Sequence, residues 1–258
     1  MSRIVTNILP WFGYLFLTAP TVVVIIMAFG NKDSLTFPPT EMSTYLFEQY
    51  FFTSDWIEVT LRSARIALLA MFCALVLGIP AAYSLVRGNY PGRRFVTIIL
   101  LSPILIPVVV VALGLLLYFS SLSLTGTELS IVAGHTVYTL PFVVVTAIAG
   151  LRHLDPNIEM AARIMGASEL RIFLSVTLPN LRSSIISGGA FAFLMSFDEV
   201  IIAYFISGVN TTTLPVKMYH TIRWEIAPVL AAVSAILILV TVLISAGVAV
   251  SQKEGETA

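Results

Sequence analysis

Charged residues are scarce in this sequence of 258 residues, and the two signs balance: 14 residues are basic, 14 are acidic, and together they make up 11% of the chain. Because soluble domains carry about 25% charged residues, this composition excludes an ordinary water-soluble enzyme. The absence of net charge removes the attraction to phosphate that nucleic-acid binding requires, so we expect no nucleic-acid partner. The lone cysteine, Cys73, excludes an internal disulfide framework and a cysteine-built zinc site.

Apolar residues dominate instead, at 58% of the chain with a mean hydropathy of +0.96. A helix needs about 20 apolar residues to cross the hydrocarbon core, and runs that are apolar all round are unlike the alternating strands of membrane barrels. We therefore predict an all-α membrane protein, a single domain over residues 1–258 with six transmembrane helices. Prolines inside the runs, such as Pro107, predict kinks rather than breaks, because membrane helices tolerate proline. The predicted spans are residues 10–30, 66–86, 95–119, 129–151, 183–207 and 226–251.

The distribution of lysine and arginine indicates which way the spans face. If the N-terminus is cytoplasmic, nine of these 14 residues fall in cytoplasmic segments and five in outer segments. Positively charged residues are enriched in the cytoplasmic loops of membrane proteins. We therefore predict that both termini and the loop 152–182 lie on the cytoplasmic side of the membrane.

The loop 152–182 is the longest predicted cytoplasmic segment, and its sequence predicts two short helices. Asp155 is a suitable N-cap before Pro156, Gly166 ends the first helix, and Ser168 caps a second helix that reaches about Thr177. Small residues between the helices would let another backbone approach closely. The loop is therefore either a knob that fits a groove on a partner or a solvated link between two spans.

Part of this loop resembles the EAA loop found in the membrane subunits of bacterial ABC importers. That signature reads E-A-A, three residues, G, nine residues, I, one residue, L-P, and this sequence matches it with Val176 in place of isoleucine. Met160 stands at the glutamate position, and the acid lies one residue earlier, a rotation of about 100° on a helix. The resemblance implies contact with an ATPase through Glu159, Met160, Ala161, Ala162, Gly166, Ala167, Ser168, Leu178 and Pro179.

A wider stretch, residues 135–250, is similar to the second permease subunit of spermidine/putrescine-type importers, most clearly at 140–146, 196–200, 205–208 and 214–219. This resemblance implies a type I ABC importer permease fold in a bacterial inner membrane, surrounded by lipid. It also implies a second permease subunit, a paralogue of this chain, with two ABC ATPase subunits and a periplasmic substrate-binding protein. A polyamine is the expected substrate, and an opine, an amino-acid derivative or a phosphonate stays open.

The sequence lacks the means to bind ATP itself. A phosphate-binding loop requires G-x-x-x-x-G-K-[ST], whereas the three lysines, Lys32, Lys217 and Lys253, do not follow a glycine. We therefore expect a non-catalytic subunit without a cofactor of its own, with ATP and Mg²⁺ bound by the partner ATPase.

Two adjacent acids, Asp198 and Glu199, interrupt the fifth apolar run. Because an ionisable group within a span costs about 2.5–3.5 kcal/mol, these residues require an explanation. In one interpretation they line a substrate pathway and attract a cation, helped by the aromatic faces of Phe197 and Tyr204. In the other they hold the structure together, through an arginine or by accepting backbone hydrogen bonds at a helix break. A stand-alone secondary transporter or channel that uses the two acids is the alternative function.

One histidine, His135, lies in the fourth apolar run without a second ligand at metal-binding spacing. We expect a buried, hydrogen-bonded ring there rather than a metal ligand.

Overall fold

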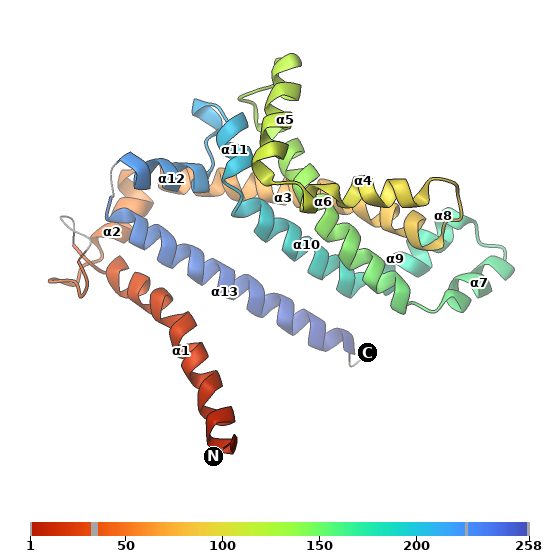
Figure 1. Cartoon of the computed structure of the whole chain (residues 1–258), viewed down its shortest axis with the longest axis horizontal. Coiled ribbons are helices and arrows are strands. Elements are labelled where there is room, and N and C mark those ends of the chain that lie inside the picture. Colours follow the sequence, from red (N-terminus) through yellow and green to blue (C-terminus); the bar gives the residue numbers. More distant parts are fainter. Residues whose placement is uncertain (1, 32–35, 225–226, 257–258) are drawn as a thin grey trace. The chain divides into compact units, whose positions relative to one another are not determined.

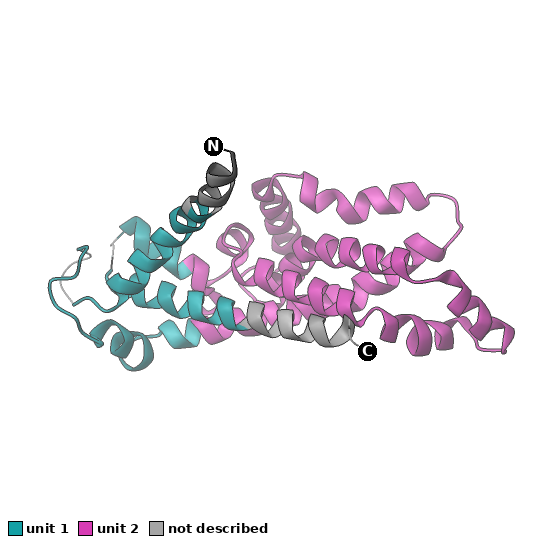
Figure 2. Ribbon diagram, turned by 90° about the horizontal axis from the view of Figure 1, so that it is seen from below, with its two compact units in different colours: residues 1–59, 217–247 teal, residues 60–216, 248–258 magenta. Residues whose placement is uncertain are grey.

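A computed structural model describes residues 2–31, 36–224 and 227–256, and these residues form helices and loops without a strand. The chain divides into two compact units (Figure 2). Unit 1 comprises residues 1–59 and 217–247, and unit 2 comprises residues 60–216 and 248–258. The all-α prediction is therefore confirmed for the described part of the chain.

Unit 1 contains α1 (Ser2–Ala28), α2 (Tyr45–Glu48) and the π-helical turn η1 (Gln49–Thr53). The amide of Ser43 donates a hydrogen bond to the Phe29 carbonyl at 2.7 Å, and the Phe29 and Phe47 rings lie 5.1 Å apart. Lys217 pairs with Asp55 and lies 4.4 Å from the centre of the Trp56 ring. These contacts join segments of unit 1 that are far apart in the sequence.

The remaining helices are shown in Figure 1. They are α3 (Trp56–Arg87), α4 (Arg93–Leu105), α5 (Val108–Ser121), α6 (Glu128–His153), α7 (Pro156–Ile164), α8 (Glu169–Ile172), η2 (Phe173–Thr177), α9 (Leu178–Asn180), α10 (Arg182–Phe197), α11 (Ile201–Ile206), η3 (Val209–Thr211), α12 (Leu214–Trp224) and α13 (Val229–Glu256).

Among the described residues, two single helices are long and apolar enough to cross a membrane, α3 with 32 residues and α6 with 26. The bent pair α4 and α5 makes a third if it counts as one span. Shorter apolar helical stretches cover Gly13–Ala28 and Val229–Leu243. Ile226, the first residue of the sixth predicted span, lies outside the described residues.

The prediction that Pro107 kinks rather than breaks the helical run over residues 95–119 was wrong. Helices α4 and α5 meet at a bend of 108°. Proline restricts the residue before it to extended backbone and supplies no amide hydrogen, and Ile106 accordingly has φ −89° and ψ 134° just before Pro107. Pro80, Pro103 and Pro141 lie inside helices, so the expectation of a tolerated proline failed at Pro107 alone among these four.

The apolar run over residues 183–207 is also interrupted, as one of the two interpretations of its adjacent acids allowed. Helix α10 ends at Phe197, α11 begins at Ile201, and the two acids Asp198 and Glu199 lie in the break between them. A buried break of this kind leaves the first amides of the second helix without intrahelical partners. An acidic side chain at the break can accept hydrogen bonds from these amides.

Helix α10 packs closely on α6 within unit 2. A Cβ atom added at Gly188 would lie 2.4 Å from the Thr146 Oγ1, and one added at Gly150 would lie 2.1 Å from the Ser184 Oγ. Glycine at these places lets the two backbones approach, as small residues do in membrane helix pairs. One buried cluster then joins α3, α6 and α10, and a second joins α3, α5, α6 and α11.

Candidate functional site

The segment 155–177, which we call the coupling knob, begins and turns as its sequence predicts. The Asp155 Oδ1 accepts a hydrogen bond from the Asn157 amide at 2.9 Å, and Pro156 opens α7. Gly166 has φ +85°, a conformation that glycine adopts without strain. The Ser168 Oγ accepts a hydrogen bond from the Arg171 amide at 3.4 Å and caps α8. These local predictions are confirmed.

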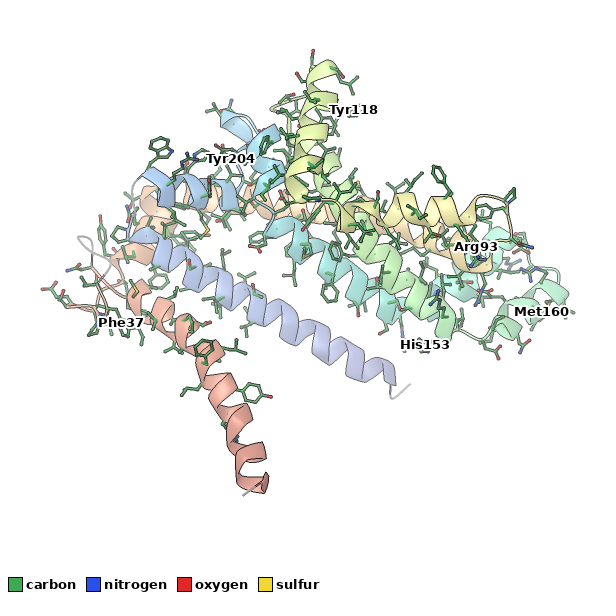
Figure 3. All side chains as sticks on the ribbon, in the orientation of Figure 1. Phe37, Arg93, Tyr118, His153, Met160 and Tyr204 are labelled. Atoms are coloured by element: carbon green, nitrogen blue, oxygen red, sulfur yellow. The ribbon has the colours of Figure 1, made fainter. Side chains whose placement is uncertain are left out.

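Several large apolar side chains are exposed on the coupling knob. Met160 is 51% exposed, and it lies at the same end of unit 2 as His153 and Arg93 (Figure 3). Ala161, Gly166, Ser168 and Pro179 are exposed, Ala167 and Leu178 are half-buried, and Ala162 is buried. The other large exposed apolar side chains of the knob are Ile158, Ile164, Met165, Leu170 and Leu174.

An exposed ion pair crosses the turn of the knob. The Arg163 guanidinium donates to both carboxylate oxygens of Glu169, at 2.5 and 2.8 Å. These hydrogen bonds hold the pKa of the Glu169 carboxyl below its usual range. The pair joins α7 to α8 from the solvent side.

Glu159 points inward, away from the apolar surface of the knob. It is only 3% exposed, and its Oε2 lies 2.8 Å from the Arg87 Nε. The Thr177 hydroxyl donates to its Oε1 at 2.8 Å, and the Arg87 Nη2 donates to the Leu154 carbonyl at 3.1 Å. Sequence reasoning missed Arg87 and Thr177 because they are 72 and 18 residues from Glu159. The signal available in the sequence was the rotation of about 100° between residues 159 and 160 on a helix, which directs their side chains to different faces.

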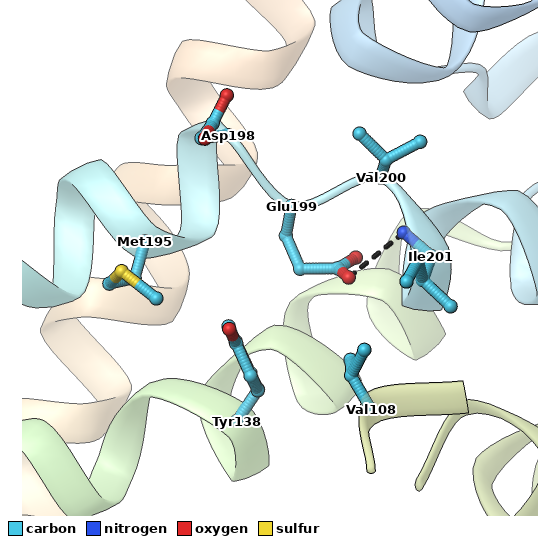
Figure 4. A pocket seen from close by; sticks show the side chains of 7 residues that line it. All are labelled: Val108, Tyr138, Met195, Asp198, Glu199, Val200 and Ile201. Atoms are coloured by element: carbon cyan, nitrogen blue, oxygen red, sulfur yellow. Dashed lines mark hydrogen bonds between the residues drawn. The ribbon is translucent and has the colours of Figure 1, made fainter. Parts of the chain in front are cut away.

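A cavity of about 210 Å³ lies at the break between α10 and α11 (Figure 4). Asp198 and Glu199, both predicted as pathway residues, line it. Phe197 and Tyr204 do not: the Phe197 ring stacks on Phe193, and Tyr204 is exposed. Tyr138 and Met195 were not predicted; Tyr138 follows His135 by three residues, so it shares that face of α6. The lining residues are Val108, Tyr138, Met195, Asp198, Glu199, Val200 and Ile201.

The two acids of the break have different tasks. Glu199 is 6% exposed; its Oε1 accepts from the Ile201 amide at 2.9 Å, and its Oε2 accepts from the Ala203 amide at 3.1 Å. Its carboxylate therefore accepts hydrogen bonds from the first amides of α11, as the helix-break interpretation predicted. Asp198 is exposed, and its carboxylate points away from Tyr138 in Figure 4.

His135 packs behind this break with a ring that is 1% exposed. Its Nδ1 lies 2.8 Å from the Ser196 Oγ, which confirms the prediction of a hydrogen-bonded ring. Its Nε2 lies 3.6 Å from the Glu199 Oε2 and makes no hydrogen bond within the described part of the chain. Those residues also contain no group of three or more histidine, cysteine or acidic side chains that could hold a metal ion.

The described residues include two helices, or three spans if the bent pair counts as one, that are long and apolar enough to cross a membrane, as in a multi-pass membrane protein. Residues 74–254 match the family described as the binding-protein-dependent transport system inner membrane component, and the chain belongs to that family.

Named relatives and a solved structure agree with this assignment. The putrescine transport system permease protein PotI of Escherichia coli (strain K12) is 32% identical over 88% of this chain and 83% of its own length. The spermidine/putrescine transport system permease protein PotC of Haemophilus influenzae is 28% identical over 93% of this chain and 94% of its own. A crystal structure of a bacterial ABC transporter that imports the acidic polysaccharide alginate has a similar chain, with a TM-score of 0.76 and 15% identity over 97% of this chain and 95% of that one. It shows the fold alone.

Proposed function

We propose that this chain is a permease subunit of an ABC importer for a polyamine or a related amino compound. The observation that carries the proposal is the similarity to the putrescine permease PotI, at 32% identity over 88% of the chain. The subunit hydrolyses nothing itself. It forms half of the translocation pathway in a bacterial inner membrane, and a second permease, a paralogue, supplies the other half.

The coupling knob is the proposed contact with an ATPase. Its exposed apolar side chains, including Met160, Ile164 and Met165, would be buried by a partner, since large apolar patches on a protein surface mark interaction sites. Two ATPase subunits that bind ATP and Mg²⁺, one on each permease, and a periplasmic substrate-binding protein complete the proposed importer.

The cavity at the helix break is the proposed pathway site. Asp198 contributes an exposed carboxylate to its lining, and Tyr138 contributes an aromatic ring at another place in the lining. An ammonium group is attracted both to a carboxylate and to the face of an aromatic ring. Glu199 contributes to the pathway site only by holding the start of α11, because its carboxylate oxygens accept hydrogen bonds from the amides of that helix.

Reconstitution tests the substrate and the class of transporter together. The chain is expressed with its neighbouring permease, ATPase and binding protein, and ATP-dependent uptake of radiolabelled putrescine into proteoliposomes is measured. We expect uptake that requires ATP and is competed by spermidine but not by an opine or a phosphonate. Uptake without the ATPase would favour a stand-alone transporter instead.

The proposed topology has six spans with both termini and the knob in the cytoplasm. It is tested in a Cys73→Ala background by Ser168→Cys on the knob and Val209→Cys, whose native side chain is 94% exposed in η3. An impermeant thiol reagent added to intact spheroplasts is expected to label the second variant and not the first. The reverse result would contradict the topology.

A further inference from the structure

A buried group of polar contacts ties the coupling knob to the rest of unit 2. We call it the brace and define it as Arg87, the Leu154 carbonyl, Glu159 and Thr177. Arg87 is the last residue of α3, and its guanidinium donates both to Glu159 on α7 and to the carbonyl that follows α6. Thr177, at the end of η2, donates to the other oxygen of Glu159. One carboxylate and one guanidinium thus join α3, α6, α7 and η2.

The brace has a rigid geometry. The guanidinium is a planar fork that presents its donors in fixed directions, and here the Nε and Nη2 reach acceptors on two different elements at 2.8 and 3.1 Å. The side chain of Glu159 is 5% exposed, and that of Arg87 is 19% exposed. Separation of such a pair would leave a charge without a partner in a poorly hydrated place, so α7 and the end of α3 are held together.

Helix α3 extends from the brace to the region of the cavity. Near Arg87 it contributes Ala82 and Leu85 to the cluster around α6 and α10. Further along, Ile66 packs in the cluster that contains Ile202 and Ile206 of α11, the helix that Glu199 caps. A displacement of α7 that preserves the brace therefore moves a helix that packs against the wall of the pathway cavity.

We propose that the Arg87–Glu159 brace transmits the movement of the coupling knob to α3, so that Arg87, Glu159 and Thr177 are positioning residues for transport and Glu159 is not a contact for the ATPase. This inference rests on the proposed function, in which an ATPase docks on the knob. The outward surface around Met160 holds the partner, and the inward face around Glu159 carries the displacement to the membrane helices.

The test uses the complete importer in proteoliposomes and compares wild type with Glu159→Gln. Glutamine keeps the size of the side chain and an acceptor for Thr177, but it removes the charge that Arg87 neutralises. We expect the ATPase to co-purify as in wild type and basal ATP hydrolysis to persist. Uptake and the stimulation of hydrolysis by the loaded binding protein should each fall about tenfold, within the ordinary range of coupling between sites. The double variant Arg87→Glu with Glu159→Arg should recover part of this loss.

The matched control is Glu128→Gln. Glu128 pairs with Arg65 through both carboxylate oxygens and also joins α6 to α3, but away from the knob and in an exposed place. The Glu128→Gln substitution should leave uptake and the stimulation of ATP hydrolysis unchanged. An equal loss in this variant would overturn the proposal, as would wild-type uptake by Glu159→Gln or loss of the ATPase from that variant.

A conservative variant decides the matter if the Glu159→Gln permease does not fold or reach the membrane, so that retention of the ATPase cannot be measured. Arg87→Lys keeps the charge but cannot donate to Glu159 and to the Leu154 carbonyl in the fixed directions of a guanidinium. We expect an assembled importer with reduced stimulation of hydrolysis, and full stimulation would reject the brace. If wild type itself retained no ATPase, the proposed function would fail, which is a different result from failure of the brace.

Discussion

Two pairs of adjacent residues at different ends of unit 2 divide their tasks in the same way. In the coupling knob, Glu159 is 3% exposed, whereas Met160 is 51% exposed. At the helix break, Glu199 is 6% exposed, whereas Asp198 lies at the surface of the cavity. In each pair one side chain turns inward and makes structural hydrogen bonds, and its neighbour is exposed.

The two buried glutamates differ in what satisfies them. The carboxylate of Glu159 depends on Arg87, which is 72 residues away, and on Thr177. The carboxylate of Glu199 depends on amides only two and four residues further along the chain. Glu159 therefore links elements that are far apart in the sequence, whereas Glu199 stabilises a local break. Substitutions should separate the two cases.

The largest effect is expected from Arg87→Met, which leaves the Glu159 carboxylate buried without its cation. Removal of one partner from a buried ion pair costs about 3–5 kcal/mol, so the melting temperature of the purified complex in detergent should fall markedly. The same substitution at Arg65, whose side chain is 62% exposed, should change it little. Equal melting temperatures for the two variants would contradict the comparison.

Glu199→Leu should destabilise the protein by a smaller amount. It would remove the acceptor from the Ile201 and Ala203 amides, of which only the Ala203 amide makes a fully buried hydrogen bond. One buried group without its hydrogen bond costs about 1–3 kcal/mol. Glu199→Gln keeps one acceptor oxygen and should lie between wild type and the leucine variant in thermal melts. A glutamine variant less stable than the leucine variant would show that backbone capping is not the task of Glu199.

Gly166→Leu tests the outward half of the knob. Nothing lies within 4 Å of a Cβ built at Gly166, so the expected cost comes from its positive φ. That cost is about 1–2 kcal/mol for a residue with a Cβ, and it should distort the turn and lower both retention of the ATPase and uptake. Gly166→Asn, which tolerates this conformation better, should retain more of both, as measured by co-purification and transport assays.

Asp198→Asn should have almost no effect on stability, because the carboxylate lies at the surface of the cavity rather than at the cap of α11. Uptake of a cationic substrate should nevertheless fall a few-fold, since an attractive charge in the pathway is lost. Parallel measurement of melting temperature and putrescine uptake checks both statements. Unchanged uptake would remove Asp198 from the proposed pathway.

The smallest effect is expected at the exposed pair in the knob. The pKa of Glu169 is lowered by the hydrogen bonds from Arg163, so its contribution is present above the carboxyl's unfolded pKa and is lost as the pH falls through the lowered folded value. Because the pair is exposed, Glu169→Gln should not change the melting temperature at neutral pH measurably. A drop comparable to that of Arg87→Met would show that the exposed pair matters as much as the buried one.

The sequence by itself determined the features that depend on composition and on near neighbours in the chain. The low charge and long apolar runs identified an all-α membrane protein, because a hydrocarbon core selects against charge regardless of the fold. The caps at Asp155 and Ser168 and the turn at Gly166 were predictable since each needs only a few adjacent residues. The signature of the knob, together with residues 135–250, indicated the family to which the chain belongs.

Only the tertiary structure decided which side chains meet. The sequence predicted a kink at Pro107, whereas the structure has a break there, with α4 and α5 meeting at 108°. The sequence also has two adjacent acids at positions 198 and 199, but it does not show that only Glu199 caps α11. The packing of α3, α6 and α10 determines that Arg87 pairs with Glu159. The same packing places Tyr138 in the cavity lining. Such pairings join residues tens of positions apart, and the packing of helices, rather than any local preference, selects them.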